Sequence, residues 1–326
     1  MQPKCSDQDF ILSWLQLKSP TLVAKKFDMD VRGVYRKRIA VEKRHNITLL
    51  ADAPQAKYES RLIIPSNMRK ELEVNNGMVV VFSDAHFWPD DPAPAYQALL
   101  KFLEMYKQEI KCVVNNGDAF DGASISRFPS INFNKLPTVQ EELEACQIAL
   151  GEIESRVLKQ TPLIWPMGNH DARFESLIVN KAPELQGLKG TQLRDYFYNW
   201  QPCYSFWING HTVIKHRNKG GAMAGRNNTI HGGVNIVTGH THVGCVNPFT
   251  DYNGTRYGVQ TGTLANPMGR QFEYCEDNPK DWMAGFAVLS FHEGKLLMPE
   301  LVRVWDDDHF EFRGKVHKVN INTHND

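Results

Sequence analysis

Side chains that bind metal ions well gather in five short segments of the chain. They are Asp84 with His86, Asp118, Asn169, His216, and His240 with His242. Carboxylate and amide oxygens combined with imidazole nitrogens suit manganese, iron(II) or zinc, and the set contains no cysteine. A shared carboxylate can bridge two cations about 3.5–4 Å apart, as in two-metal hydrolases, and Asp118 is the candidate for that position.

The spacing within two of these segments favours a shared site. On an extended chain, alternate side chains point to the same side, so Asp84 and His86 would face one way. The same holds for His240 and His242. Each pair alone is more typical of a surface turn. The prediction therefore rests on the joint occurrence of all five segments, each of which follows an apolar stretch.

The apolar stretches that precede these segments read as strands. They cover residues 78–83, 110–115, 162–167, 212–215 and 235–238. Helix-like patterns at 95–109 and 138–158 separate the first three. Alternating strands and helices indicate an α/β domain. Such domains place their ligands at the carboxyl ends of strands, and the polar segments stand at those ends here.

The later part of the chain is less regular. Five glycines between residues 219 and 233 predict a mobile loop. Residues 282–291 and 295–305 read as two further strands that close a second sheet. The acidic run from Asp306 to Asp308 reads as a solvated turn rather than as a metal cluster.

Five motifs occur in the order that is typical of one enzyme family. They are Asp84-Ala85-His86, Gly117-Asp118-Ala119-Phe120-Asp121, Gly168-Asn169-His170-Asp171, the later His216, and Gly239-His240-Thr241-His242. The series resembles the calcineurin-like metallophosphoesterases over residues 77–305. This resemblance implies an α/β fold, a four-layer β-sandwich flanked by helices with a dinuclear metal site at the strand ends.

The resemblance also implies a role for each metal ligand. The first metal would be bound by Asp84, His86 and His242. The second would be bound by Asn169, His216 and His240, and Asp118 would bridge the two. His211 competes with His216, but it lies in a predicted hairpin turn, Asn209-Gly210-His211, so we expect His216 to be the ligand.

Two divalent cations are the cofactors that this resemblance implies, with Mn2+ expected first and Fe2+, Zn2+ or Mg2+ as alternatives. They would neutralise the phosphoryl oxygens, and a hydroxide that bridges them would attack phosphorus, because metals lower the pKa of bound water toward ~7. The resemblance gives His170 the role of protonating the leaving oxygen or stabilising the transition state. Asp121 and Asp171 would accept hydrogen bonds that orient imidazoles.

The amino-terminal segment has a different composition. The whole chain carries 37 basic and 37 acidic side chains, but residues 1–46 hold ten basic and five acidic ones. Helices are predicted at 9–18, 21–27 and 31–45. The last two fit a helix-turn-helix motif around Ala24, except that Asp28 replaces the usual turn glycine. The second helix of such a motif lies in the major groove of DNA.

This predicted recognition helix would bind DNA with four basic side chains, Arg32, Arg36, Lys37 and Arg38. The alternative is a helical appendage with a solvated basic face, used for packing or oligomerisation. We expect DNA as a partner, no membrane contact, and an oligomeric state that the sequence leaves open.

The composition predicts four regions and a cytoplasmic protein. The regions are a basic helix-turn-helix-like, all-α head at 1–50, a polar linker at 51–76, the phosphoesterase-like domain at 77–305 and a tail at 306–326. No apolar run approaches the ~20 residues of a membrane span, and the first residues lack the apolar core of a secretory signal. A short hydrolase with a DNA-binding head is similar to phage-encoded proteins, which would place it in a host cytoplasm.

The motif details favour some phosphoesters over others. Protein phosphatases of this kind show Asp-Arg-Gly and Gly-Asn-His-Glu, whereas Gly122 follows Asp121 here and Asp171 replaces the glutamate. The segments are similar to those of SbcD-type DNA nucleases, although no capping region of that type is recognisable in 265–326. With the basic head, this predicts a DNA nuclease or DNA-end-processing phosphodiesterase.

Two alternatives stay open. One is a small-molecule phosphodiesterase or phosphomonoesterase whose head serves assembly. The other is a DNA-binding regulator on a phosphoesterase scaffold, which the complete ligand set disfavours.

Overall fold

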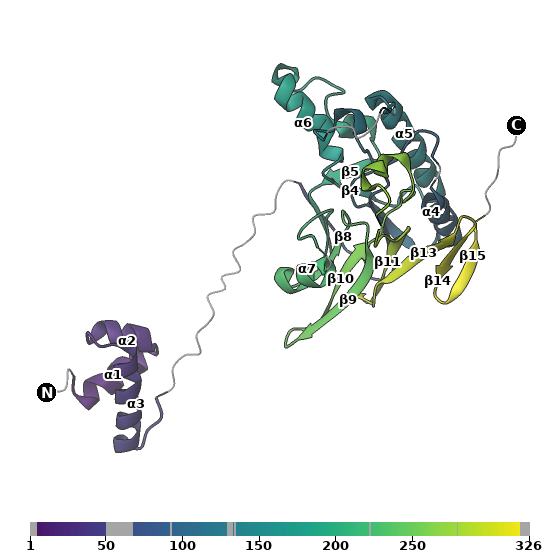
Figure 1. The fold of residues 1–326 in the computed structure, drawn as a ribbon. Helices are drawn as coiled ribbons and strands as arrows, with labels where there is room; N and C mark the ends of the chain where they lie inside the picture. The colour runs from purple at the N-terminus through teal and green to yellow at the C-terminus, as the bar shows by residue number, and fades with distance from the viewer. Residues whose placement is uncertain are drawn as a thin grey trace, which may run out of the picture. The chain divides into compact units, whose positions relative to one another are not determined.

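The computed structural model describes residues 5–49 and 68–319, apart from residues 92, 129–132, 134, 222 and 279. The chain divides into two compact units, Met1–Pro65 and Ser66–Asp326 (Figure 1). Most of the expected linker, residues 51–67, lies outside the described residues. None of the described helices has the length and apolarity that a membrane span requires.

Within its described part, residues 5–49, the first unit consists of three helices, α1 (Asp7–Leu17), α2 (Pro20–Lys26) and α3 (Val31–His45). Each begins at a residue whose side chain accepts a backbone N–H of the first turn: Ser6, Ser19 and Asp30. Such caps satisfy N–H groups that have no partner within the helix. The helices enclose a small core of Phe10, Trp14, Val23, Ala24, Val34, Val41 and Leu49.

The second unit contains two sheets among the residues that the structure describes. The first has the order β1 (Arg69–Leu72), β6 (Ser205–Ile208), β7 (Thr212–Ile214), β8 (Asn235–Thr238), β10 (Gly254–Thr261), β9 (Gly244–Asp251). The second has the order β15 (Lys315–Lys318), β14 (His309–Phe312), β13 (Glu300–Asp306), β11 (Gly285–His292), β2 (Gly77–Phe82), β3 (Ile110–Asn115), β4 (Leu163–Pro166), β5 (Trp200–Cys203), and β12 (Lys295–Leu296) pairs with β11.

The helices of this unit are α4 (Pro94–Met105), α5 (Val139–Arg156), α6 (Asp171–Lys181) and α7 (Ala224–Gly232). Short 3-10 turns are η1 (Ala123–Ile125), η2 (Pro183–Leu185), η3 (Leu193–Tyr196) and η4 (Arg270–Cys275).

These elements form the predicted four layers. One face of β2 presents Val79 and Val81 to a core shared with the first sheet, where Phe206 and Val237 lie. The other face presents Val80 to a second core beneath α4 and α5. Because both faces of β2 are covered, its sequence is apolar throughout rather than alternating. On the outer side of the first sheet, α7 contacts β8, β9 and β10 (Figure 1).

The prediction of a mobile loop at 219–233 was wrong, because α7 occupies most of it. One of the glycines there, Gly225, serves close packing. A Cβ on Gly258 of β10 would collide with the backbone oxygen of Gly225 in α7. A helix can approach a strand this closely only where both backbones lack side chains.

Two expected boundaries also differ from the structure. Residues 69–72, which we assigned to the linker, form β1 and pair in parallel with β6. Residues 309–318, which we assigned to the tail, form the hairpin of β14 and β15 at the edge of the second sheet. The reason is burial: Phe310 and Phe312 of β14 are almost fully enclosed, beside α4. The predicted strand at 295–305 is divided into β12 and β13.

Candidate metal centre

The expected ligands all follow strands that end near one another. Strands β2, β3 and β4 are parallel neighbours in one sheet, and β7 and β8 are parallel neighbours in the other. The backbone N–H of His240, after β8, donates to Asp84, after β2, at 2.9 Å. The carboxyl ends of both sheets therefore meet, and the side chains that follow them converge.

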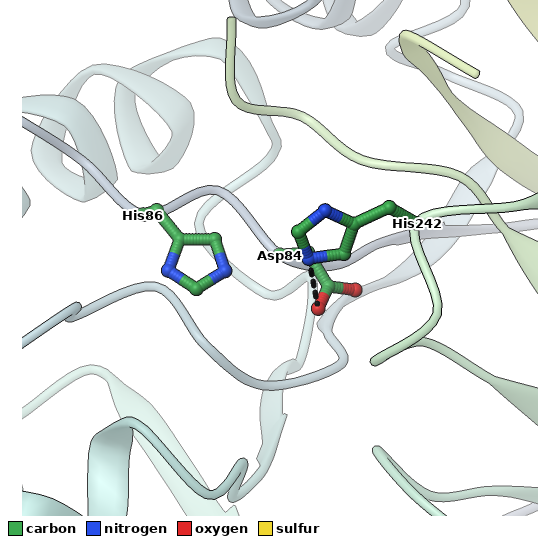
Figure 2. A group of neighbouring side chains, drawn as sticks. All are labelled: Asp84, His86 and His242. Carbon is green, nitrogen blue, oxygen red and sulfur yellow. Dashed lines mark ion pairs between the residues drawn. The ribbon is translucent and has the colours of Figure 1, made fainter. Parts of the chain in front are cut away.

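Asp84, His86 and His242 form the first group, with one ligand atom of each within 4.8 Å of the others (Figure 2). Nε2 of His242 lies 3.3 Å from the Asp84 carboxylate, and the hydroxyl of Ser83 donates to the same carboxylate at 2.5 Å. Asp84 is fully buried. Burial alone would raise its pKa, but the nearby His242 holds the pKa of Asp84 at about 2.

Asp118, His216 and His240 form a second group, in which one ligand atom of each residue also lies within 4.8 Å of the others. Nδ1 of His216 donates to the backbone oxygen of Asn116 at 2.7 Å, and its Nε2 lies 2.9 Å from Asp118. Burial would lower the pKa of this histidine, but Asp118 raises the pKa of His216 to about 10. The competing His211 lies elsewhere, with its Nε2 donating to the oxygen of Gly294 at 2.9 Å.

Asp118 belongs to a third group as well, with His86 and His170. One carboxylate is thus within reach of imidazoles from both sheets. This is the arrangement that a carboxylate shared between two cations requires.

Several buried electron-pair donors at this site lack a hydrogen-bond partner among the described residues. They are Nε2 of His86, Nδ1 of His242 and Oδ1 of Asn169. Buried polar atoms are rarely left without a partner, and each exception calls for an explanation. Nitrogen and oxygen atoms of this kind are ligands for zinc, manganese and iron(II), so the donor set fits a divalent cation.

Asp121 lies behind two of the histidines. Its Oδ1 accepts from Nδ1 of His86 at 2.8 Å and from Nδ1 of His170 at 2.7 Å. Burial opposes ionisation, but hydrogen bonds from His170 and His86 hold the pKa of Asp121 well below its usual range. An Nδ1–H held in this way leaves Nε2 of the same ring with a free electron pair.

Asp171 has a different role from the one expected. Asp171 is the first residue of α6, and it contacts backbone N–H groups and one indole rather than an imidazole. Its carboxylate accepts five N–H groups, from Asp118, Ala119, Phe120, Gly168 and the indole of Trp165, at 2.8–3.2 Å. The residue therefore fixes the backbone that carries Asp118.

The model of the calcineurin-like phosphoesterase family matches residues 77–242, more than half of the 326-residue chain. The chain belongs to this family. Among curated protein sequences, none matches it.

The phosphoesterase domain is also similar to solved structures. Vps29 from Entamoeba histolytica, crystallised with zinc, has 16% identity and a TM-score of 0.39, over 74% of this chain and 96% of that chain. A protein of Streptococcus pneumoniae described as a predicted phosphoesterase has 12% identity and a TM-score of 0.33, over 75% of this chain and 98% of that chain.

The backbone of the phosphoesterase site is unusual. Five of the expected ligands have left-handed φ angles between 40° and 70°: Asp84, His86, Asp118, His240 and His242. A non-glycine residue in a sparsely populated region costs on the order of 1–3 kcal/mol, and such residues cluster at functional sites. The turns are held in place by surrounding hydrogen bonds, such as that from Leu264 N–H to the oxygen of Ser83.

Glycines in the motifs make room for the ligands. Gly117 has a φ of 86°, and a Cβ there would lie 2.5 Å from Nδ1 of His216. A Cβ on Gly168 would collide with the Asp118 carboxylate. The glycines that precede Asp118 and Asn169 are therefore required by close approach of neighbouring ligands.

Two aromatic residues beside the phosphoesterase site were missed. The ring centroid of Phe272 lies 5.3 Å from those of both His86 and His242, and Trp282 lies 4.3 Å from His242. They come from the segment that contains η4, and nothing in their local sequence indicates contact with metal ligands. Ser83 was also missed, although its position directly before Asp84 was a usable signal.

The four basic residues expected to bind DNA have two different environments. Arg32 and Arg36 are exposed on α3. Lys37 is half-buried and donates to the oxygen of Cys5 at 2.8 Å, and Arg38 donates to Glu42 at 2.9 Å and lies over Trp14. The latter pair therefore takes part in the packing of the helices.

Proposed function

We propose that this phosphoesterase is a two-metal phosphodiesterase that cleaves DNA. The observation that carries the proposal is that Asp118, which is buried, lies within reach of His86 and His170 on one side and of His216 and His240 on the other, beside the buried group of Asp84, His86 and His242. Among the described residues, unpartnered donor atoms on His86, Asn169 and His242 support cation binding.

The first cation would be held by Asp84, His86 and His242, and the second by Asn169, His216 and His240, with Asp118 shared. When bound, the two cations supply positive charge for the phosphoryl oxygens and lower the pKa of a bound water.

Residues behind the ligands would set their orientation. Asp121 holds His86 and His170 by their Nδ1 atoms, so the two rings are positioned together. His170 would donate a proton to the leaving oxygen through Nε2. Arg173 lies against this atom at 3.2 Å and would also be able to reach an anionic ester.

The amino-terminal unit supports DNA as the substrate. Basic side chains that neutralise phosphates bind DNA by releasing its counterions, so the contact depends on salt. Arg32 and Arg36 of α3 are exposed and suited to this contact. A tethered DNA-binding unit raises the local concentration of substrate around the phosphoesterase domain.

A second candidate is a small-molecule phosphodiesterase or phosphomonoesterase whose amino-terminal unit mediates assembly. It is supported by exposed apolar residues on one face of α3, Val31, Tyr35 and Ile39, which are 40%, 47% and 64% exposed. Spacing of four residues places them along a single stripe.

Cleavage of labelled linear and circular DNA in manganese, magnesium or chelator tests the proposal, with bis(p-nitrophenyl) phosphate and p-nitrophenyl phosphate assayed alongside. The first candidate predicts metal-dependent DNA cleavage that falls in an Arg32→Ala/Arg36→Ala variant, while the small diester is still hydrolysed. Hydrolysis of the small diester with no DNA cleavage would favour the second candidate.

A further inference from the structure

A cavity of about 430 Å3 adjoins the first group of metal-binding side chains. His86 lines it together with the segment after β2, the start of α4 and one face of α5. A second cavity of about 450 Å3 shares Trp88, Pro89, Asp90, Asp91 and Asn266 with the first, so the two adjoin. Volumes in this range suit a small ligand or one unit of a larger one.

The lining of the first cavity combines aromatic rings with carboxylates. Trp88 and Tyr96 supply the aromatic surface. Asp90, Asp91 and Glu144 supply carboxylates. Among the described residues of this lining, none is lysine or arginine, whereas the adjoining second cavity has one basic residue, the exposed Arg270. The cavity is therefore unsuited to a second phosphate and suited to an aromatic group that donates hydrogen bonds.

Other carboxylates of the lining already have partners. Glu152 accepts from the hydroxyl of Tyr96 at 2.5 Å, and Glu141 accepts from the backbone of Thr138 at 2.7 Å in the cap of α5. From the residues that the structure describes, Asp91 accepts a single long hydrogen bond of 3.4 Å, from Asn266. Acceptor capacity thus remains on the side of the cavity that Trp88 and Asp91 form.

The second group of metal-binding side chains has the opposite charge around it. Arg217 follows His216 directly, and Lys219 comes two residues later; both are exposed. Arg226 of α7 is exposed as well and lies over the ring of Phe249. Basic groups of this kind follow the backbone of single-stranded nucleic acid, whereas bases stack on aromatic rings.

We infer that the cavity beside His86 binds the terminal nucleoside of a nucleic-acid chain, with the base against Trp88 and its N–H groups toward Asp90 and Asp91. This inference rests on the proposed function and extends it, because it makes the enzyme end-directed. Within the first cavity the next phosphate of a continuing chain would meet carboxylates, which disfavours passage of a chain. The remaining phosphates would lie toward Arg217 and Lys219. Hydrolysis adds water across the ester: the water oxygen bonds to phosphorus, the P–O bond to one sugar breaks, and that oxygen takes up a proton.

Two small substrates with the same leaving group test the cavity. The p-nitrophenyl ester of thymidine 5′-phosphate carries a nucleoside, and bis(p-nitrophenyl) phosphate does not. We expect the manganese-loaded wild-type protein to prefer the nucleoside ester in kcat/KM. Trp88→Ala should reduce that preference by about fivefold or more, the scale of one base–aromatic stacking contact. Trp88→Phe should restore most of it, which a purely structural role of Trp88 would not require.

A matched control is Trp305→Ala, since Trp305 is 65% exposed on β13 and does not line either cavity. Its preference should equal that of wild type. An unchanged preference in Trp88→Ala would overturn the inference. So would stronger hydrolysis of p-nitrophenyl phosphocholine than of the nucleoside ester, because the cavity would then take a cationic alcohol.

Closed circular single-stranded DNA provides the second test, beside the same sequence in linear form. Degradation of the linear form from an end, with the circle left intact, is expected. Cleavage of the circle would overturn end-directed action, but it would still agree with the proposed nuclease activity. If no ester is hydrolysed at all, the proposed function fails. Binding of thymidine to the chelator-treated protein, measured by saturation-transfer NMR, would still test the cavity, and no binding would overturn it.

Discussion

Nη2 of Arg173 lies 3.2 Å from Nε2 of His170. A guanidinium can only donate, so the histidine accepts at Nε2 and carries its proton on Nδ1, where it donates to Asp121 at 2.7 Å. Burial opposes protonation of the ring, but the Asp121 carboxylate raises the pKa of His170 above its usual value. The ring is therefore ready to take a proton at Nε2 once the guanidinium moves to another acceptor.

His170→Gln should lower turnover of a small diester by about 10²–10⁴-fold, the usual range for loss of a general acid. Both metals should stay bound, because His170 is not among the proposed ligands. Metal content by plasma mass spectrometry, beside steady-state rates, checks this. A variant that has lost one metal would show that His170 is a ligand.

Asp118→Asn should abolish activity and weaken binding of both cations, because the substitution removes the shared negative charge while keeping the shape. Circular dichroism should show an intact fold. Asp307→Asn is the control, since Asp307 is an exposed acid of the β13–β14 turn. Turnover that returns at excess manganese in Asp118→Asn would contradict the shared position.

Metal affinity should rise with pH up to about pH 10. Asp118 raises the pKa of His216 to about 10, although burial opposes this, so the metal-free ring is protonated at neutral pH. A cation must displace that proton. The same proton stabilises the metal-free fold below pH ~6.5, the unperturbed pKa of histidine, and this contribution is lost as the pH rises through 10. Isothermal titration calorimetry of metal binding, in buffers of different ionisation enthalpy, should show that a proton is released at pH 7. Metal binding without proton release would contradict the prediction.

Glu142→Gln should make the fold less sensitive to pH. Glu142 is fully buried in α5, with Oε1 accepting from Ala123 N–H at 3.0 Å and Oε2 without a partner among the described residues. Burial raises its pKa to about 8. Between pH ~4.5 and 8 the unfolded chain ionises while the fold does not, so stability falls by about 1.4 kcal/mol per pH unit at most. Urea unfolding at pH 5 and pH 8 should show that the free energy of unfolding falls less in the variant than in wild type as the pH rises. An equal fall in both proteins would contradict the prediction.

Arg32→Ala/Arg36→Ala should weaken DNA binding and reduce the slope of log K against log salt by about 1.8, since each phosphate contact contributes about 0.9. Lys37→Ala/Arg38→Ala is the informative comparison, because these side chains contact Cys5 and Glu42 within the helical unit. The Lys37→Ala/Arg38→Ala change should lower the melting temperature of the helical unit and should have the smaller effect on the salt slope. Equal salt slopes in wild type and Arg32→Ala/Arg36→Ala would favour an assembly role for α3 over DNA binding.

Local patterns predicted much of the phosphoesterase fold. Strands β3 and β8 have the predicted bounds, because each is an apolar run that ends in a glycine turn before a ligand. The edge hairpin β14–β15 was missed because both strands are only four residues long and β15 buries none of its side chains. Helix α7 was missed because the role of Gly225 depends on its close approach to β9 and β10, which local spacing does not record.

The candidate site was likewise predicted where local patterns indicate it and missed where it depends on contacts between distant segments. The side chains that converge were predicted because each stands at the end of a strand. The acceptor role of Asp171 toward five N–H groups could not be predicted, because it depends on how α6 begins beneath the loop after β3. Contacts of Phe272 and Trp282 with His242 depend on a long return of the chain from β10 to β11, which no local spacing records.

The left-handed turns at Asp84, His86, Asp118, His240 and His242 have a consequence for protein engineering. The side chains could be copied onto another scaffold as a list of ligands, yet their directions come from backbone turns that most scaffolds lack. What would have to be transplanted is each turn as a whole, with its strand end and its glycine. In this protein the transferable unit is a set of three turns, after β2, β3 and β8, and the ligands are the side chains that these turns direct into the site.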